Sequence, residues 1–348
     1  QVTVLERAEV PGGKIHTQSV GPVQIDSGPT VFTMRWVFDE LLRSVGTRLD
    51  DQLRLAPLSV LARHFWYDGS QLDLFADAQR SEAAVAEWAG RAEALRFREF
   101  CERTRRVHDT LEGPVMRSPR PGMVELTARL GPSGLAVLSS IGPMRTLWQQ
   151  MVLQFRDPRL QQLFARYATY CGSSPWQAPS TLMLVAQVEM DGVWSVEGGM
   201  GALCAMLARL ATDHGARLRL GCAAQRIDVL QGRVHGVELA SGEVLPADLV
   251  LFNGEVAALR QGLLGPAVRE AVPTQVPARS LSAMTWACTR HWAAWRWTAT
   301  TCFSVPNTSR SSTTSSFTSA CRACPRFTCA RKTVPLPCPK ANPSGCWP

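Results

Sequence analysis

The chain opens with a short apolar run that leads into an acid and a glycine pair. Residues 2–5 are mostly β-branched, which predicts a buried strand. Glu6 follows directly, and an acid at the end of such a strand can accept hydrogen bonds from a ribose hydroxyl pair. In Pro11-Gly12-Gly13-Lys14 the glycines let backbone approach a pyrophosphate closely, and Lys14 adds positive charge. This stretch predicts half of a dinucleotide site. Its other half, a glycine-rich turn, is expected before residue 1.

Charge is unevenly distributed along the chain. The 348 residues carry a formal net charge of +8 and are enough for two domains. Residues 285–348 hold eight Lys or Arg and no Asp or Glu, so residues 1–284 have 29 basic and 29 acidic side chains. A neutral body argues against broad electrostatic capture of nucleic acid, and no nucleic-acid partner is expected.

The cysteines of the body point to a reducing compartment. Cys101, Cys171, Cys204 and Cys222 are scattered, without metal-ligand or disulfide spacing. The sequence shows no signal peptide and no apolar run near the ~18 residues that span a bilayer. A cytoplasmic location is therefore expected, with no metal site.

Two kinds of segment alternate along the first 190 residues. Strands are predicted at 23–26, 58–66 and 71–75, the last two as a hairpin, with a turn at 27–30. Apolar residues at helical spacing predict helices at 36–45, 78–111, 157–170 and 180–190. Proline- and glycine-rich breaks at 118–122 and 131–134 separate further helical segments that continue through residue 154.

A second compact unit follows. The glycines at 198, 199 and 201 open a helix that runs to about His214 and ends at Gly215. A strand at 217–220, a hairpin at 226–239 and an apolar return strand at 249–252 complete the unit. These elements predict an α/β fold with a doubly wound nucleotide-binding domain that is split in sequence. A mixed domain of strands and helices lies between its two segments.

These residues together resemble the phytoene desaturase-type, FAD-dependent carotenoid desaturases. The resemblance covers about residues 1–284. More narrowly, the runs ARHFW (62–66), LFARYATY (163–170) and GVW (192–194) resemble bacterial hydroxyneurosporene or methoxyneurosporene desaturases, the 1-hydroxycarotenoid 3,4-desaturases. The general resemblance rests, in order, on Glu6 with Pro11-Gly12-Gly13, Asp26-Ser27-Gly28-Pro29-Thr30, Gly198-Gly199-Met200 and Asn253-Gly254.

The resemblance implies a glutathione reductase-like FAD domain and a set of cofactor contacts. It places Glu6 on the adenosine ribose, and Gly12, Gly13 and Lys14 beside the pyrophosphate and flavin. The remaining implied cofactor residues are Arg7, the turn Gly28-Pro29-Thr30 near the isoalloxazine, Ala224 at the adenine, and Asn253. No side chain is identified as a catalytic acid or base.

The implied reaction removes two hydrogens from a C–C bond of an apolar polyene, with FAD as acceptor. The protein would supply a dry, shaped tunnel for this chemistry. A carotenoid substrate arrives from the bilayer, so peripheral membrane contact is expected, with entry near the helices of residues 120–155.

Several of these features also have plainer interpretations. An acid after a strand is most often a solvated strand end, and Gly198-Gly199 equally suits a tight loop before a helix. His16, His64 and His214 lack partners at a telling spacing, which favours structural or surface histidines. The aromatic run at 65–67 is typical of core and rim positions.

The composition changes beyond about residue 285. Residues 285–348 contain five Trp, seven Cys and a dense Ser/Thr run but no Asp, Glu, Ile or Met. Cys321-x-x-Cys324 with Cys329 and Cys338 does not pair as two zinc knuckles. A natural disordered tail would be poor in Trp and Cys. We therefore interpret 289–348 as an irregular, aberrant tail produced by a reading-frame shift near Cys288.

The sequence thus predicts five segments and leaves rival functions open. They are a first FAD-domain segment (1–50), a substrate and membrane-facing domain (51–195), a second FAD-domain segment (196–265), a return strand to the substrate domain (266–288) and the tail (289–348). With both ends of the FAD domain incomplete, weak FAD binding and an inactive fragment are expected. The rivals are a phytoene desaturase proper, an amine oxidase-like flavoprotein, and a noncatalytic binding protein with a basic Cys-rich tail.

Overall fold

The computed structural model describes residues 1–272 except Tyr67, 119–122, Ile141 and Pro143. It also describes two short paired strands, β12 (Ala287–Thr289) and β13 (Thr328–Ala330). The predictions for the rest of the segment after residue 272, including the aberrant tail, lie outside the described residues.

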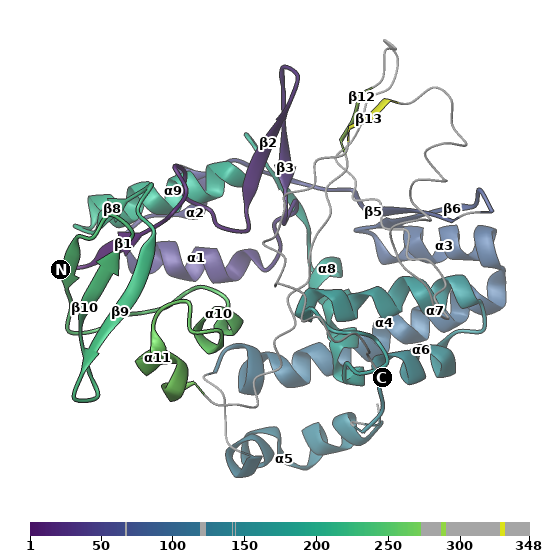
Figure 1. Cartoon of the computed structure of the whole chain (residues 1–348). Helices are drawn as coiled ribbons and strands as arrows, with labels where there is room; N and C mark the ends of the chain where they lie inside the picture. The colour runs from purple at the N-terminus through teal and green to yellow at the C-terminus, as the bar shows by residue number, and fades with distance from the viewer. Residues whose placement is uncertain are drawn as a thin grey trace, which may run out of the picture.

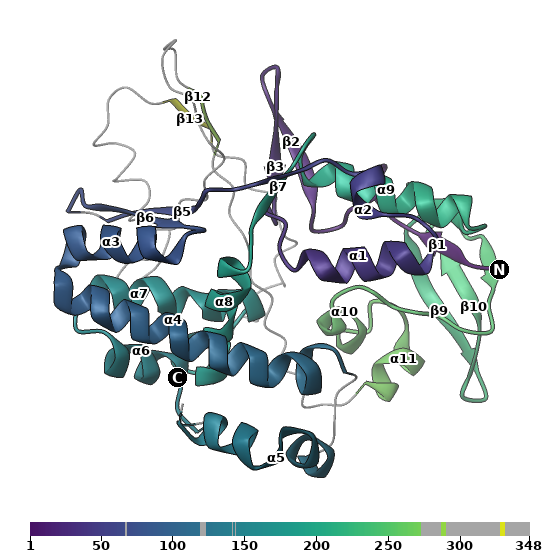
Figure 2. The same cartoon turned by 180° about the vertical axis from the view of Figure 1, so that it is seen from behind.

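The opening strand lies in a small parallel pair. β1 (Thr3–Leu5) pairs with β8 (Arg217–Arg219), so two segments more than 200 residues apart lie side by side (Figure 1). The helices α1 (Arg35–Ser44) and α9 (Met200–Asp213) lie beside this pair in both views (Figures 1 and 2). Their shared core contains Leu42, Leu203 and Met206, together with Leu49 of α2 (Leu49–Gln52). The two FAD-domain segments predicted from the sequence therefore pack into one unit.

An antiparallel sheet extends this unit. β9 (Ala224–Leu230), β10 (Arg233–Leu239) and β11 (Val244–Pro246) are ordered β11-β10-β9. The predicted β9–β10 hairpin is confirmed, with Gln231 and Gly232 both at positive φ, as a two-residue hairpin turn of type I′ requires. α10 (Val256–Arg260) and α11 (Pro266–Ala271) follow, and the Ile227 amide donates to the Leu264 carbonyl at 3.0 Å.

The strand predicted at 249–252 is wrong, and the return strand predicted over 266–288 is wrong at residues 266–271, although residues 287–288 belong to β12. Residues 249–252 form no strand, and Leu249 and Leu251 are 72% and 87% exposed. An apolar strand is stable only beside a partner, and the described residues provide no third parallel strand next to β1 and β8. Residues 266–271 of the predicted return strand are the helix α11, which begins with Pro266 at its first turn.

Two antiparallel pairs lie between the two halves of the molecule (Figure 1). β2 (His16–Val20) and β3 (Val23–Ser27) form a hairpin, and β4 (Leu55–Pro57) pairs with β7 (Trp194–Val196). Phe32, which is 1% exposed, forms a bridge to Trp194 beside this pair. The chain thus leaves and re-enters the half that contains β1 and β8 along adjacent strands.

The second half is a layer of helices beneath the predicted hairpin of β5 (Val60–Phe65) and β6 (Gln71–Phe75) (Figure 1). Its core is aromatic: Phe164 packs against Phe97, Phe100 and Phe155 at ring-centroid distances of 4.6–5.9 Å. The helical elements are α3 (Ala78–Ala89), α4 (Arg91–Leu111), η1 (Glu112–Met116), α5 (Met123–Ser140), α6 (Leu147–Gln154), α7 (Pro158–Ala165), η2 (Arg166–Cys171), η3 (Ser180–Leu184) and α8 (Val185–Met190).

The helix breaks and one helix cap have clear local causes. Gly90, at φ 91°, separates α3 from α4, so the single helix expected over 78–111 is two. Gly131, at φ 63°, kinks α5 next to Pro132. Asp157 caps α7 by accepting from the Arg159 amide at 2.8 Å, which confirms the predicted cap.

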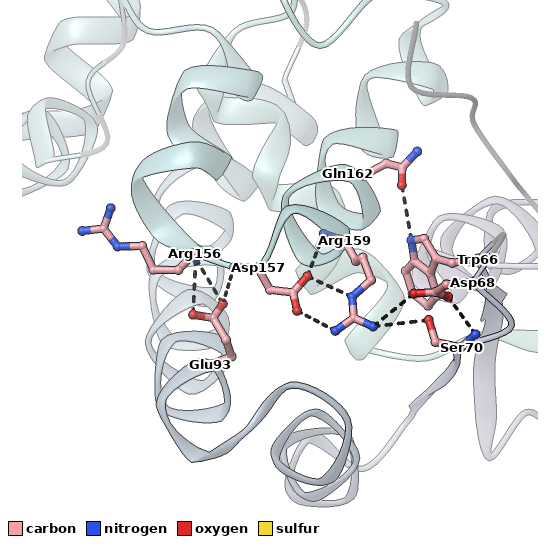
Figure 3. A network of polar contacts seen from close by, with 8 residues as sticks. All are labelled: Trp66, Asp68, Ser70, Glu93, Arg156, Asp157, Arg159 and Gln162. Carbon is pink, nitrogen blue, oxygen red and sulfur yellow. Dashed lines mark hydrogen bonds and ion pairs between the residues drawn. The ribbon is translucent and has the colours of Figure 1, made fainter.

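A buried carboxylate joins α4 to the start of α7 (Figure 3). Glu93, only 6% exposed, accepts hydrogen bonds from the Arg156 and Asp157 amides at 3.1 and 3.2 Å. Arg159 then links Asp157 to the β5–β6 hairpin, through its ion pair with Asp68. The network therefore fixes the hairpin over the helices. No helix in the described part of the chain is both long and apolar enough to cross a bilayer.

Candidate cofactor site

Glu6 lies at the carboxyl end of β1, where the sequence places a ribose contact. Its amide donates to Arg219 of β8 at 3.0 Å, and its carbonyl accepts from Cys222 at 2.9 Å. The carboxylate Oε1 accepts from the Ala8 amide at 2.8 Å, which orients the side chain over its own loop. Within the described residues the second oxygen, Oε2, has no partner and can accept from a ligand.

The glycine loop is closed against the turn after β3. A Cβ at Gly12 would lie 2.2 Å from the Ile15 carbonyl oxygen, and one at Gly28 would lie 2.1 Å from the Lys14 carbonyl oxygen. Both glycines have positive φ, so these close approaches require residues without a side chain. Gly13 differs, because a Cβ there would meet nothing within 4 Å. The structure thus brings together Gly12, Gly13 and Gly28.

Asp26 is a site residue to which the sequence analysis gave no role of its own. Its Oδ2 accepts from the Met200 amide at 2.8 Å, at the first residue of α9. A Cβ at Gly199 would lie 2.8 Å from Oδ1 of the same carboxylate. The amino end of α9 is therefore capped by a carboxylate, which favours the tight-loop interpretation of Gly198-Gly199. An acid at the end of a strand, just before a glycine turn, is the signal that would have pointed to it.

The partly buried thiol of Cys204 lies behind the glycine loop. Its Sγ is 3.4 Å from the position of a Cβ at Gly12. Burial raises the pKa of this thiol, and the nearby Asp26 carboxylate raises it further. Cys204 therefore stays protonated at neutral pH and acts as a packing group beneath the loop.

The cationic residues of the site are in different states. Lys14 forms an ion pair with Glu255, two residues beyond the predicted cofactor residue Asn253. Arg7 is exposed and has no ion pair among the described residues. A phosphate at this site could therefore pair directly with the Arg7 guanidinium. The Lys14 ammonium would first have to break its ion pair with Glu255.

The remaining predicted residues lie at the edges of the site. Ala224 begins β9, opposite Leu239, and is exposed. Pro29 and Thr30 follow Gly28 on the way to the buried Phe32, and Pro29 is exposed.

The donor set suits the nucleotide end of FAD. Glu6 offers a carboxylate acceptor for a ribose, and Arg7 offers a free cation. The Gly13 amide has no hydrogen-bond partner among the described residues and lies on an open loop, as contact with a phosphate requires. When bound, FAD would accept a hydride, and these residues would hold and orient its nucleotide end.

Comparison with known proteins shows which proteins the chain is similar to. A hydroxyneurosporene desaturase of Rubrivivax gelatinosus is 53% identical over 287 residues, covering 82% of this chain and 55% of the relative. The hydroxyneurosporene desaturase of Cereibacter sphaeroides is 45% identical over 289 residues, covering 82% and 58%. The all-trans-zeta-carotene desaturase of Myxococcus xanthus is 32% identical over 275 residues, covering 78% and 51%. The chain spans just over half the length of these relatives.

Solved structures give a weaker likeness. An oxidoreductase from Methanosarcina mazei aligns with a TM-score of 0.46 and 15% identity, over 79% of this chain and 57% of that one.

The profile of the flavin containing amine oxidoreductases matches residues 1–334, nearly the whole sequence. The chain is therefore a member of the flavin containing amine oxidoreductase family, with FAD as its cofactor and an α/β FAD-binding fold.

Proposed function

We propose that this chain belongs to an FAD-dependent desaturase that removes two hydrogens from a C–C bond of a hydroxy- or methoxyneurosporene-type carotenoid. The observation that carries the proposal is the 53% identity to a hydroxyneurosporene desaturase over 287 residues. The reaction belongs to carotenoid biosynthesis, and the substrate is an apolar polyene.

The rival enzymes have less support. A phytoene dehydrogenase of Streptomyces griseus is 34% identical over 260 residues, well below the hydroxyneurosporene desaturases.

Purified chain mixed with FAD is offered 1-hydroxyneurosporene in detergent micelles or the diamine putrescine. Retention of the carotenoid supports the proposal, and any product with a longer conjugated system identifies desaturation by its red-shifted absorbance. Peroxide release from putrescine without carotenoid retention would establish the amine oxidase alternative instead.

The cofactor residues of this proposal are those that the sequence predicted. They are Glu6, Arg7, Gly12, Gly13, Lys14, Gly28, Pro29, Thr30, Ala224 and Asn253. Residues 1–50 and 196–265 form the FAD domain, and residues 51–195 form the substrate domain. The pairing of β1 with β8 and the ion pair of Lys14 with Glu255 support this division.

FAD titration tests the cofactor residues. Only β1 and β8 form parallel pairing among the described residues, so we expect weak binding without stoichiometric FAD after purification. Glu6→Gln removes the ribose acceptor charge and should raise the Kd of FAD about tenfold, as for a charge-assisted hydrogen bond. Glu9→Gln is the matched control, because Glu9 lies in the same loop and is exposed. Equal Kd values for both variants would remove Glu6 from the site.

Peripheral membrane contact from the cytoplasm is a further element of the proposal. The surface around α5 exposes large apolar side chains, among them Val124 at 86% and Met144 at 95%. An apolar surface of this kind inserts readily into the headgroup region of a bilayer. Val124→Asp should reduce co-sedimentation with vesicles of phosphatidylglycerol and phosphatidylethanolamine. Leu263→Asp, at a 63% exposed position beyond α10, should not. Equal loss in both variants would contradict a role for α5.

We also propose that the residues after about 288 arise from a reading-frame shift. The abrupt change of composition near Cys288 supports this. Translation of the gene in the other two frames beyond that codon tests it. The absence of a family-like continuation in both frames would rule it out.

A further inference from the structure

One long stretch of the helical half is almost free of acidic residues. Residues 126–188 contain five arginines and a single acid, Asp157. The Asp157 carboxylate caps α7 and forms an ion pair with Arg159, so its charge is balanced. Arg145 and Arg156 are exposed and make no ion pair among the described residues. This stretch therefore places two uncompensated positive charges on the surface.

The two free arginines stand at the two ends of α6. Arg145 lies just before its first turn and Arg156 just after its last. Between them Gln149, Val152 and Leu153 are exposed at i, i+3 and i+4 spacing, so they share one face. In Figure 3 the Arg156 side chain extends away from the polar network between α4 and α7. The helices α7 and η3, which pack against α6, contain no acidic residue. The exposed face is thus apolar along α6 and cationic at both ends.

A loop with an exposed tryptophan adjoins this face. Residues 172–179, the tryptophan loop, are held to the start of α6, because the Trp148 amide donates to the Pro175 carbonyl at 2.9 Å. The rings of Trp148 and Trp176 lie 5.2 Å apart, and Trp176 is 56% exposed. The loop and α6 therefore form one surface with an indole beside the apolar face.

The chemistry of this surface matches an anionic lipid bilayer. Tryptophan is favoured at the level of the headgroups, and exposed aliphatic side chains gain by leaving water for the acyl boundary. Arginine can pair with a lipid phosphate while its stem stays on apolar surface. A negatively charged headgroup layer attracts such cations and repels acidic side chains, which this surface lacks. A nucleic acid would pair with the arginines but leave Val152 and Leu153 in water.

We propose that α6 and the tryptophan loop bind a bilayer through its anionic headgroups. Arg145 and Arg156 pair with lipid phosphates, and the side chains of Val152, Leu153 and Trp176 insert between the headgroups. The inference rests on the proposed function, whose membrane contact it deepens by assigning the charge of the lipid and the residues that recognise it.

Co-sedimentation of the full chain with two kinds of vesicle tests the charge of the lipid. One kind is phosphatidylcholine alone, and the other is phosphatidylcholine mixed with phosphatidylglycerol. An arginine near an anionic surface favours binding by about fivefold, so the mixed vesicles should bind about 25-fold more tightly at low salt. Equal binding to both kinds would overturn the inference and leave the membrane contact standing. Absence of binding to either kind would reject both.

Variants locate the charge preference on α6. Arg145→Gln and Arg156→Gln should each weaken binding to the mixed vesicles about fivefold and leave binding to phosphatidylcholine unchanged. Arg233→Gln is the matched control, since Arg233 is exposed at the start of β10 and has no ion pair among the described residues. All three positions are exposed, so the circular dichroism spectra should stay the same. Equal losses in the three variants would overturn the role of α6.

Brominated phosphatidylglycerol tests the tryptophan loop, because it quenches the emission of a tryptophan that it contacts. Quenching should fall in Trp176→Phe, and unchanged quenching would overturn the insertion of the loop. A second copy of the chain is the rival occupant of this surface. Leu153→Asp should reduce vesicle binding. If it instead abolished self-association in gel filtration and left vesicle binding unchanged, the surface would be a dimer interface and the proposal would be wrong.

Discussion

The carboxylate of Asp26 accepts a hydrogen bond of 2.8 Å from the amide of Met200, 174 residues further along the chain. One end of this contact lies on β3 and the other is the first residue of α9. An acid at a helix amino terminus satisfies an otherwise unpaired amide and interacts favourably with the helix dipole. The contact therefore fastens β3 to the start of α9.

Replacing this carboxylate should loosen the two segments. Asp26→Ala leaves the Met200 amide without its acceptor, so the free energy of unfolding should fall by about 1–2 kcal/mol. Asp26→Asn keeps a hydrogen-bond acceptor, so its free energy of unfolding should fall by less. Urea unfolding measures both, with Asp248→Ala as control, since Asp248 is exposed and has no partner among the described residues. Equal stability of Asp26→Ala and the control would contradict a capping role.

The two glycines of the opening loop should differ sharply in tolerance. Gly12→Ala drives a Cβ to 2.2 Å from the Ile15 carbonyl, at φ +140°. Backbone displacement and strain should cost ~3 kcal/mol of stability. Gly13→Ala meets nothing within 4 Å and incurs only the cost of the left-handed conformation, ~1 kcal/mol. Urea midpoints of the two variants measure the difference. Similar losses would show that the loop relaxes freely at Gly12.

Local signals in the sequence predicted the elements whose stability is local. The β9–β10 and β5–β6 hairpins and the Asp157 cap all depend on residues within a few positions of each other. The prediction of a strand at 249–252 was wrong because a strand needs a neighbouring strand to pair with. The four residues of this apolar stretch do not specify such a partner. Contacts across long separations, such as Asp26 with Met200, have no sequence signal beyond an acid in a suitable place.

Glu93 should be among the most sensitive charged positions. Glu93→Ala leaves the Arg156 and Asp157 amides without their carboxylate and removes the ion pair with Arg96, at 2.7 Å. Because the amides are part-buried, the free energy of unfolding should fall by about 2–4 kcal/mol. Glu87→Ala, at an exposed position on α3, should change it by less than about 0.5 kcal/mol. Thermal unfolding compares the two. A small effect at Glu93 would mean that water replaces the carboxylate.

The buried His64 should make stability depend on pH in mildly acidic solution. Burial and Arg166 lower its folded-state pKa to about 3, against an ordinary value of 6.5. Between these values the unfolded chain binds a proton at His64 that the folded chain does not. Stability contributed by the neutral ring is therefore complete above pH 6.5 and falls as the pH drops toward 3, by up to about 1.4 kcal/mol per pH unit. Urea unfolding between about pH 7 and pH 5 avoids most carboxylate titration. His64→Phe should lose this slope and His235→Phe should keep it. A slope that persists in His64→Phe would place the titrating group elsewhere.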